Sequence, residues 1–528
     1  MAKAMLKDKE CWMRHLSLDP YTGSDPPGIK VRSAQGVEAA DYFAGPYWVW
    51  SKMIENMADV GYDPVNMALL PYDWRLSFPL LEERDGYLTT LKNKIEFLHK
   101  KTGEKVVLMS HSFGGSLSLY FFQWVTHSES EGGGGGGKDW LEKHVHAFVN
   151  IAGTVLGVPK AFPALLSGEM KDTSSFTGTM DRVLETFFGR KKRKDLWCKW
   201  GSLWAMLPKG GSPIWGIGAD IPNSSEWPSE NPIMYMINND TIAATTRAMD
   251  CASLAATDDK AQESCSPADY VLEKILRNGY ASFEDGIELL QTWGSGYGSK
   301  LSSSLRHTFR KPGETTVRGL NEKDWHNPSV MPLPYAPSMK MYCLYGIGRP
   351  TERGYVYKVN QLGLEDTEAS IFHGGTFADP PIIMATNITY QDRPIKNGVL
   401  LSDGDGTVPL LSEGYMCASG WVENSKLNPS RIKTFTREYV HSVSFQYSDP
   451  GRGGPYSSEH VDILGNVATT EDILKVVTGF DDASVVDLIL SDLKKISETI
   501  NSHPDGGVKS DGKKKKDKRH LNIFPLAG

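Results

Sequence analysis

The sequence predicts an α/β fold, in which a doubly wound and mostly parallel sheet carries a large inserted cap region. Three observations lead to this prediction. Helices and strands alternate up to residue 112, which is typical of parallel strands joined by crossover connections. An apolar strand then runs through a tight turn directly into an apolar helix. The segment 155–330 has weak strand periodicity and is rich in Gly, Pro, Asn and Trp, which favours a cap inserted into the sheet.

The helices and strands before residue 112 are predicted from the spacing of apolar residues and from glycines that typically end helices. An aromatic stretch from Tyr47 to Val60 predicts a helix that ends at Gly61. The apolar run Met67–Leu70 predicts a strand, and residues from about Glu82 to Lys101 predict a second helix that stops at Gly103. The apolar face of this second helix consists of Leu88, Leu91, Ile95 and Leu98.

The later elements are short apolar or alternating runs. Ala147–Ile151 predicts a buried strand, and the sheet resumes at Lys340–Gly346. A further apolar strand begins at Val399 and leads into a turn, and Ile432–Val440 alternates as a last strand. The amphipathic stretch Val485–Ile500 is expected to cover an edge or a face of the sheet.

These elements divide the chain into four predicted parts. Residues 1–154 and 331–500 form the two halves of the core, and residues 155–330 form the cap or lid insertion. Residues 501–528 form a disordered basic tail. Within the first part, the segment 128–138 contains six consecutive glycines and predicts a flexible surface loop.

The composition narrows the possible function classes. The chain has 528 residues and is 40% hydrophobic, which is enough to bury a large core. A net charge of −7 argues against a nucleic-acid partner. No apolar run approaches the roughly 18 to 20 residues that span a bilayer, and the N-terminus does not resemble a signal peptide. The basic run at 513–519 is more typical of a solvated end than of a lipid-binding patch.

The cysteines and the sequons say little about disulfides, metal binding or the cellular compartment. Six cysteines are too few and too widely spaced for a disulfide scaffold, and no spacing fits a zinc site, so neither a metal nor another cofactor is expected. Sequons at Asn223, Asn239 and Asn387 permit a secretory compartment without requiring one. The cysteines are Cys11, Cys198, Cys251, Cys265, Cys343 and Cys417.

The turn at residues 110–114 has the pattern of a nucleophile elbow. An apolar run, Val106–Met109, precedes it, and an apolar helix follows. A serine at the apex of such a turn has strained backbone, so small residues must stand two positions before and after it. Ser110 and Gly114 occupy these positions around Ser112. The pattern therefore predicts an α/β-hydrolase core with Ser112 as its nucleophile.

A serine nucleophile needs an imidazole to accept its proton and a carboxylate to orient that imidazole. In this fold the chain order is Ser, then Asp or Glu, then His. Asp405 follows an apolar strand in a Gly-Asp-Gly turn, and His460 lies in the loop after the next strand. We therefore predict Ser112, Asp405 and His460 as a catalytic triad.

Other residues could fill these roles. Asp403 shares the turn with Asp405, although it could instead bind the backbone of that turn, as Asp commonly does. His441 ends an alternating strand, and His373 precedes Asp405, contrary to the expected order. Seven of the fourteen tryptophans fall in the predicted cap. Most of them are expected to pack the core of the cap, and one or two could line an acyl pocket.

The chain resembles the lecithin:cholesterol acyltransferase-like lipases, and within them the phospholipid:diacylglycerol acyltransferases of fungal, plant and algal type. The resemblance runs from about Cys11 to about Ile500. The segments that carry it include CWMRHLSLDPYTGSDPPGIKVR, DYFAGPYWVW, PYDWRLSF, SHSFGG, GVPKAFPALLSGEMKD, MLPKGG, YCLYGIGRPTERGYVYK, DGDGTVP and EHVDILG.

This resemblance implies roles for further residues. It implies the same triad, with the Phe113 N–H as one donor of the oxyanion hole. It also implies a disulfide between Cys343 and Cys417, which would place the chain on the lumenal face of the endoplasmic reticulum. Asp73, Trp74 and Arg75 are expected at the active-site edge, where Asp73 and Arg75 either form an ion pair that shapes the substrate site or an ordinary surface pair.

The resemblance also implies a reaction and its partners. Ser112 would take an acyl group from a phospholipid at a membrane surface, and diacylglycerol would then accept it, giving triacylglycerol and a lysophospholipid. Water as the acceptor would make the chain a phospholipase or acylhydrolase. Sterol is a further possible acceptor. A chain without a working triad would be an inactive lipid-binding homologue.

The sequence departs from this family at its beginning. Relatives carry a membrane-spanning helix, a strand and a Pro-Gly loop before the point that matches Cys11, and the loop supplies a second oxyanion donor. The element pattern likewise has no strand before the helix at Tyr47. The expectation is thus an N-terminally truncated acyltransferase, with the first strand or strands of the sheet missing, which is weak or inactive alone.

Overall fold

The structure is a computed structural model of the 528-residue chain. It describes residues 8–44, 47–171, 188–221, 232–237, 267–294, 310, 319–360, 382–390, 394–423, 426–444, 452–480, 482–504 and 506–507. His373, the sequons at Asn223 and Asn239, and the predicted tail beyond residue 507 lie outside these ranges.

A four-stranded parallel sheet forms the centre of the molecule. Its strand order is β12-β7-β4-β3, and each pair of neighbours runs parallel. The strands are β3 (Val106–His111), β4 (Val145–Ile151), β7 (Lys340–Ile347) and β12 (Lys433–Val440). The predicted α/β fold with a parallel sheet is therefore confirmed.

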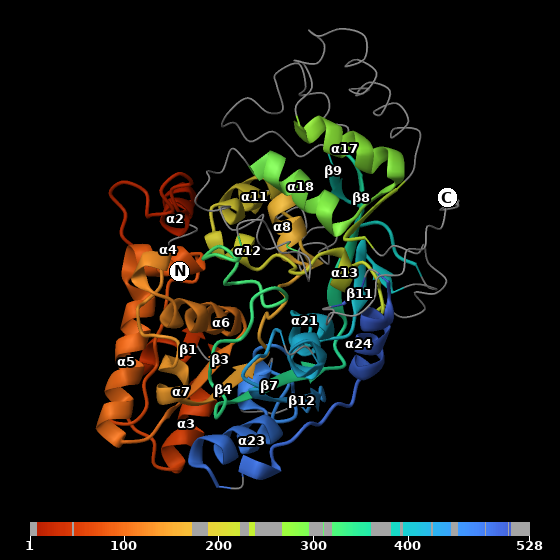
Figure 1. The fold of residues 1–528 in the computed structure, drawn as a ribbon. Helices are drawn as coiled ribbons and strands as arrows, with labels where there is room; N and C mark the ends of the chain where they lie inside the picture. The colour runs from red at the N-terminus through yellow and green to blue at the C-terminus, as the bar shows by residue number, and fades with distance from the viewer. Residues whose placement is uncertain are drawn as a thin grey trace.

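Helices cover both faces of this sheet (Figure 1). On one face, Met53 and Met57 of α3 pack with Ile473 of α23 against β4 and β7. On the other face, Ile95 of α5 and Phe122 of α6 belong to the larger core cluster. The helices of the first face are α3 (Ser51–Asp59) and α23 (Val467–Thr478). Those of the second are α5 (Tyr87–Thr102), α6 (Phe113–Thr126), α7 (Trp140–His144), α21 (Leu410–Tyr415) and α24 (Leu493–Ser502).

A second, mixed sheet lies above the central sheet in Figure 1, next to α17 and α18. Its order is β10-β11-β8-β5-β6, and β9 pairs with β8. The strands are β5 (Met234–Met236), β6 (Tyr280–Ala281), β8 (Thr351–Val359), β9 (Ile382–Met384), β10 (Ile395–Lys396) and β11 (Val399–Ser402). The strand at Val399 thus pairs with β8 of this sheet, whereas the sequence pattern placed it in the central sheet.

The second sheet combines segments from both sides of residue 330. Strands β5 and β6 come from the predicted cap, and β8 to β11 come from the predicted C-terminal half of the core. The helices packed around it from the cap segment are α8 (Ala161–Ser167), α11 (Arg190–Cys198), α12 (Gly201–Ala205), α13 (Ser212–Trp215), α17 (Pro267–Asn278) and α18 (Phe283–Gly294). The four-part division of the chain stays a prediction.

Short elements complete the described chain. The helices are α2 (Lys9–Leu16), α4 (Phe78–Asp85) and α22 (Trp421–Glu423), and a hairpin is formed by β1 (Tyr42–Ala44) and β2 (Tyr47–Trp48). A π-helical turn, η6 (Met416–Gly420), follows α21, and 3₁₀ turns lie at η1 (Val37–Ala39), η2 (Glu129–Glu131), η7 (Asp462–Gly465) and η8 (Asp482–Ser484).

Three predicted elements differ from the structure before the elbow. The helix predicted from Tyr47 begins at Ser51, because Tyr47 and Trp48 pair in a hairpin. The helix predicted from Glu82 is broken at Gly86, whose φ of 61° is left-handed and ends α4. Met67–Leu70 forms no strand, since no described segment pairs with it. The Leu70 carbonyl accepts a hydrogen bond from the Tyr87 hydroxyl instead, at 3.0 Å.

The glycine-rich loop is tied to the end of α6. The N–H groups of Gly134 and Gly136 donate to the carbonyls of Trp124 and Val125, at 2.7 and 2.9 Å. A Cβ atom on Gly134 would collide with the indole ring of Trp124. The run of glycines thus permits a close approach of backbone to an aromatic ring, which low-complexity composition alone does not reveal.

The C-terminal helix begins later than the amphipathic pattern predicts. Helix α24 starts at Leu493, and the preceding residues run past β12 without forming a helix. The Leu488 N–H donates to the Thr436 carbonyl at 2.8 Å, and the Glu438 N–H donates to the Leu488 carbonyl at 2.9 Å. The edge of β12 is therefore covered by an extended segment. In the described part of the chain, no helix combines the length and the apolar content needed to cross a bilayer.

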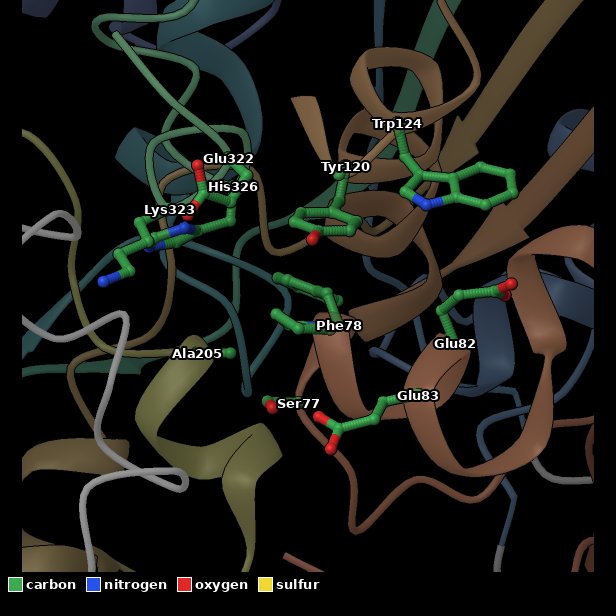
Figure 2. A pocket seen from close by; sticks show the side chains of 12 residues that line it. Ser77, Phe78, Glu82, Glu83, Tyr120, Trp124, Ala205, Glu322, Lys323 and His326 are labelled. Carbon is green, nitrogen blue, oxygen red and sulfur yellow. The ribbon is translucent and has the colours of Figure 1, made fainter. Parts of the chain in front are cut away.

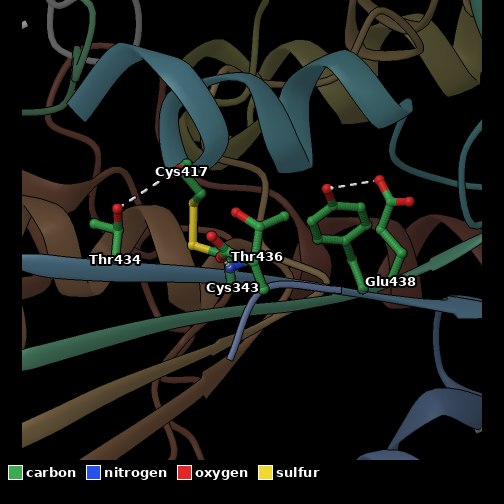
Figure 3. Close-up of a disulfide and its surroundings, with 7 residues drawn as sticks. Cys343, Cys417, Thr434, Thr436 and Glu438 are labelled. Atoms are coloured by element: carbon green, nitrogen blue, oxygen red, sulfur yellow. Dashed lines mark hydrogen bonds between the residues drawn. A yellow bond between two sulfur atoms is a disulfide. The ribbon is translucent and has the colours of Figure 1, made fainter. Parts of the chain in front are cut away.

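A disulfide joins Cys343 of β7 to Cys417 of η6, with an S–S distance of 2.01 Å (Figure 3). The two cysteines are 74 positions apart in sequence, so the bond closes a long loop. Beside it, the Thr434 hydroxyl donates to the Cys417 carbonyl at 3.2 Å. The disulfide thereby fixes the helical segment that follows Asp405 onto the central sheet.

Candidate active site

Ser112 stands at the sharp turn between β3 and α6. Its φ of 56° and ψ of −124° are strained for a residue with a side chain. The turn is crowded, since a Cβ atom on Gly114 would lie 3.4 Å from the Cβ of Ser110. A Cβ on Gly115 would collide with the Asn150 side chain. Small residues are therefore required at these positions for the serine to reach the apex.

The structure brings the three predicted triad residues together. The His460 Nε2 lies 2.8 Å from the Ser112 Oγ, and the His460 Nδ1 lies 2.5 Å from the Asp405 Oδ2. Residues 348 positions apart in sequence thus meet at the carboxyl end of β3. With Nδ1 protonated and donating to Asp405, the Nε2 can accept the serine proton, which is the arrangement that activates a hydroxyl.

The Asp405 carboxylate is held by its own turn. Its Oδ1 accepts from the N–H groups of Thr407 and Val408, both at 2.8 Å, and the side chain is fully buried. Burial by itself raises the pKa of this carboxyl. The charge of His460 and the hydrogen bonds outweigh burial, so the Asp405 pKa lies below its usual value. Asp405 thus remains ionised and able to stabilise a charged imidazole.

The rival residues have other contacts. The Asp403 carboxylate accepts from the N–H groups of Gly348 and Gly404, at 2.7 and 2.8 Å, so it binds the backbone of the turn. The His441 Nδ1 lies 3.4 Å from the Ser457 hydroxyl at the end of β12. Neither residue contacts Ser112 or His460 in the hydrogen bonds of the described chain.

The N–H group of Phe113 is available for an oxyanion. Phe113 is the first residue of α6, where an N–H has no partner within its own helix. Among the described residues no acceptor binds this N–H. The positive end of the helix dipole lies at the same point and favours negative charge. This position suits a negative charge that develops on an ester oxygen attacked by Ser112.

His111 is a part of the site that the sequence pattern did not single out. Its Nε2 donates to the His460 carbonyl at 2.6 Å, and the two imidazole rings lie 4.8 Å apart. Burial, followed by the charge of His460, lowers the pKa of His111 to about 3. A neutral His111 therefore holds the backbone of the catalytic histidine. The only signal in the sequence was its place beside the serine.

Glu413 is a second residue that the sequence pattern did not reveal. It lies in the first helical turn of α21, shortly after the loop that carries Asp405, and its side chain is 1% exposed. Its two carboxyl oxygens have no hydrogen-bond partner in the described chain while the group is ionised. Burial raises the pKa of Glu413 well above its usual value, and the charge of Asp405 raises it further. A protonated Glu413 is placed to donate to Asp405.

Asp73 and Arg75 form a buried ion pair. The Arg75 guanidinium contacts Asp73 at 2.7 Å and Asp25 at 2.8 Å, and Arg84 also contacts Asp73 at 2.7 Å. Arg75 is 1% exposed, so the expectation of an ordinary surface pair is wrong. Among the described residues, no hydrogen bond or ion pair joins Asp73 or Arg75 to the triad, and a role in substrate binding stays a prediction. Trp74 is half exposed and packs edge-on against Trp200, with ring centroids 4.7 Å apart.

Most of the described cap tryptophans pack into cores. Trp204 and Trp215 are almost fully buried, and the Trp215 ring carries the guanidinium of Arg353 at 5.0 Å from its centroid. Trp325 packs edge-on against Tyr120 of α6, with ring centroids 5.7 Å apart. Packing therefore accounts for these side chains. Trp227 lies outside the described residues.

A family model and the most similar relatives described here all point to acyltransferases. The family model for lecithin:cholesterol acyltransferase matches residues 1–467. The phospholipid:diacylglycerol acyltransferase of Schizosaccharomyces pombe is 38% identical over 95% of this chain and 70% of its own length. The Saccharomyces cerevisiae protein of the same name is 39% identical over 91% of this chain and 65% of its own length.

Plant relatives give a similar match. The phospholipid:diacylglycerol acyltransferase 1 of Arabidopsis thaliana is 35% identical over 93% of this chain and 77% of its own length. This chain thus spans about two thirds to three quarters of the relatives named here. A solved structure, the Tle4–Tli4 complex, contains a chain that aligns with this one at 14% sequence identity. The alignment covers 77% of this chain and 68% of the other chain. Its TM-score of 0.30 is too low to carry a conclusion.

Proposed function

Because the chain belongs to the lecithin:cholesterol acyltransferase family, we propose that it transfers a fatty acyl group from a phospholipid to diacylglycerol. The products are triacylglycerol and a lysophospholipid. The observation that carries this proposal is the continuous hydrogen-bonded path from Ser112 through His460 to Asp405. The names of the most similar relatives, matched over more than 90% of this chain, support the choice of substrates.

The first half of the reaction forms an acyl-enzyme. The Ser112 Oγ attacks the ester carbonyl of the phospholipid while His460 takes the serine proton. The Phe113 N–H binds the oxygen that becomes negative. The ester C–O bond then breaks, and His460 returns the proton to the leaving lysophospholipid. The acyl group remains on Ser112 as an ester.

The second half repeats these steps with a new hydroxyl. His460 takes the proton of the diacylglycerol hydroxyl, whose oxygen attacks the acyl-serine ester. The bond from the acyl carbon to the Ser112 Oγ breaks, and His460 returns the proton to Ser112. Asp405 stabilises the charged imidazole in both halves. Water competes for the same acyl-enzyme, so transfer requires an acceptor site that excludes water.

Product analysis tests this proposal. The chain is incubated with a phospholipid labelled in its acyl chain, with and without diacylglycerol, and the labelled lipids are separated. We expect label in triacylglycerol only when diacylglycerol is present. Label in free fatty acid alone would contradict transfer and favour the phospholipase alternative. Failure of Ser112 to react with a fluorophosphonate would instead favour an inactive lipid-binding homologue.

The endoplasmic reticulum lumen is the compartment that we propose for this reaction. The disulfide supports it, because such bonds persist in oxidising compartments. The sequon at Asn387 is exposed and accessible to glycosylation. Expression in a eukaryotic cell followed by glycosidase treatment tests the assignment. A mobility shift that is lost in Asn387→Gln is expected, and an unglycosylated Asn387 would count against this placement.

A further inference from the structure

A cavity of about 360 Å³ lies beside the elbow helix and has no part in the steps above. Figure 2 shows it between α4, the outer part of α6, α12 and the segment that carries Glu322. Volumes from about 300 Å³ upward are typical of small-molecule sites. The cavity is thus large enough for the headgroup of a lipid.

The floor of the cavity is aromatic. Phe78, Tyr120 and Trp124 line it, and the Phe78 and Tyr120 rings stack with centroids 5.2 Å apart. Tyr120 is 4% exposed, and in the described chain its hydroxyl has no hydrogen-bond partner. Figure 2 shows this hydroxyl pointing into the space between Phe78 and His326. The hydroxyl can therefore form a hydrogen bond with a ligand that occupies the cavity.

The rim of the cavity carries charges of both signs, with negative charge in excess. Glu82, Glu83 and Glu322 contribute three carboxylates, and Lys323 contributes one ammonium group. The Glu82 carboxylate accepts from the Thr89 N–H at 3.0 Å and turns away from Tyr120 in Figure 2. Burial raises the pKa of Tyr120, and the charges of Glu322 and Glu82 raise it further. Glu322 and Lys323 are exposed and can reach a ligand that enters from solvent or from a membrane surface.

We propose that this cavity binds the zwitterionic headgroup of the donor phospholipid, a phosphate ester that carries an ammonium group. The ammonium would lie on the aromatic faces between the carboxylates, where cation–π attraction adds to charge attraction. The phosphate would accept from the Tyr120 hydroxyl and from Lys323. A headgroup that has a phosphate but no ammonium group would be repelled by the carboxylates, because it has no positive charge to offset their excess. This proposal rests on the proposed function, which supplies the phospholipid.

The position of the cavity fits a donor site. Tyr120 follows Ser112 by eight residues on the same helix, which corresponds to about 12 Å along the helix axis. The Phe78 ring also stacks on Phe113, with centroids 5.0 Å apart. A headgroup in the cavity therefore lies one aromatic ring away from the residue that supplies the oxyanion donor.

Binding is measured without turnover to separate this proposal from the reaction. The Ser112→Ala chain, which cannot form an acyl-enzyme, is titrated calorimetrically with glycerophosphocholine, glycerophosphoethanolamine and glycerophosphoglycerol. We expect the first two to bind and the third to bind at least about tenfold more weakly. Equal binding of all three, or no binding at all, would overturn the proposal whatever the activity of the chain.

Variants locate the site. Tyr120→Phe removes only the hydroxyl and Glu322→Gln removes one charge, and each should weaken the binding of glycerophosphocholine about fivefold to tenfold. Glu498→Gln is the matched control, because Glu498 is exposed on α24 at a distance from the cavity. Unchanged affinity in both cavity variants, or an equal loss in the control, would place the binding site elsewhere.

Kinetics then distinguishes a lipid headgroup from a free metabolite. In the chain with Ser112 intact, Tyr120→Phe should raise KM for phosphatidylcholine more than it lowers kcat, and it should affect phosphatidylglycerol less. If this variant weakens the binding of free glycerophosphocholine and leaves KM for phosphatidylcholine unchanged, the cavity serves a free metabolite. That result would contradict the assignment to the phospholipid donor.

Discussion

At the scale of single residues, the site depends on buried side chains whose protonation is set by burial together with neighbouring charges and hydrogen bonds. The Asp405 carboxyl is kept ionised by His460 and by its own turn. The Glu413 carboxyl beside it is kept protonated, because burial and the Asp405 charge both disfavour its anion. Two neighbouring carboxyl groups with pKa values shifted in opposite directions are typical of catalytic sites.

We predict that Glu413 positions Asp405 and tunes the basicity of His460. Glu413→Ala removes the donor to Asp405, so Asp405 should attract the imidazole proton more strongly. The acid limb of the pH profile of kcat/KM should then move to higher pH, with kcat reduced by roughly tenfold. Glu413→Gln keeps a neutral donor, and its pH profile should match that of the wild type. A shift of the same size in both variants would contradict this role.

His111 should make the stability of the protein dependent on pH. Its pKa is about 3 in the folded chain and about 6.5 in the unfolded chain, so only the unfolded chain binds a proton between these values. The stabilisation is complete above pH 6.5 and is lost as the pH falls towards 3. Between pH 7 and pH 5 this group alone should cost about 2 kcal/mol of unfolding free energy.

Urea denaturation at the two pH values measures this effect. The loss of unfolding free energy from pH 7 to pH 5 should be smaller in His111→Gln than in the wild type by that amount. All other titratable groups are common to the two proteins, so the difference isolates His111. Equal losses in the two proteins would show that His111 can accept a proton in the folded state.

At the scale of elements, the disulfide connects the catalytic turn to the sheet. Asp405 lies in the turn that leads into α21 and η6, and Cys417 holds η6 to Cys343 of β7. A covalent bond that closes a long loop stabilises the folded state mainly by restricting the unfolded chain. Its loss should therefore reduce both stability and the order of the catalytic turn.

Replacing Cys343 and Cys417 together with serine should lower the unfolding free energy by roughly 3 to 5 kcal/mol. Denaturation curves with and without a reducing agent measure this change, and reductant should affect the wild type only. Cys11→Ser is the control, because Cys11 is an exposed free thiol. A denaturation midpoint of the wild type that does not respond to reductant would contradict a stabilising bond.

The sequence predicted the elements that are defined by local patterns. The elbow was predictable because strain at Ser112 demands small neighbours at Ser110 and Gly114. The parallel strands were predictable from short apolar runs. Met67–Leu70 was predicted as a strand from its composition, but a strand also needs a partner, and pairing is not a local property.

The features that the sequence did not predict depend on contacts between segments that are distant in sequence. The Val399 strand was predicted, but its membership of the second sheet depends on pairing with β8. Glu413 and His111 gave no separate signal, because their roles come from burial against Asp405 and His460. The glycine run appeared to be a flexible loop by composition, whereas its contact with Trp124 is a packing relation.

At the scale of the whole molecule, the site lies where three distant parts of the chain meet. The nucleophile comes from the central sheet, the acid follows a strand of the second sheet, and the base precedes η7. The two sheets must therefore be correctly docked for Asp405 to reach His460.

The most direct measurement follows the acyl group itself. The chain is mixed briefly with a phospholipid in the absence of acceptor, quenched in acid, digested, and examined by mass spectrometry. We expect one acyl chain on the peptide that contains Ser112, and diacylglycerol added before the quench should remove this acyl chain as triacylglycerol. An unmodified Ser112 in a chain that still forms triacylglycerol, or transfer by Ser112→Ala, would contradict it.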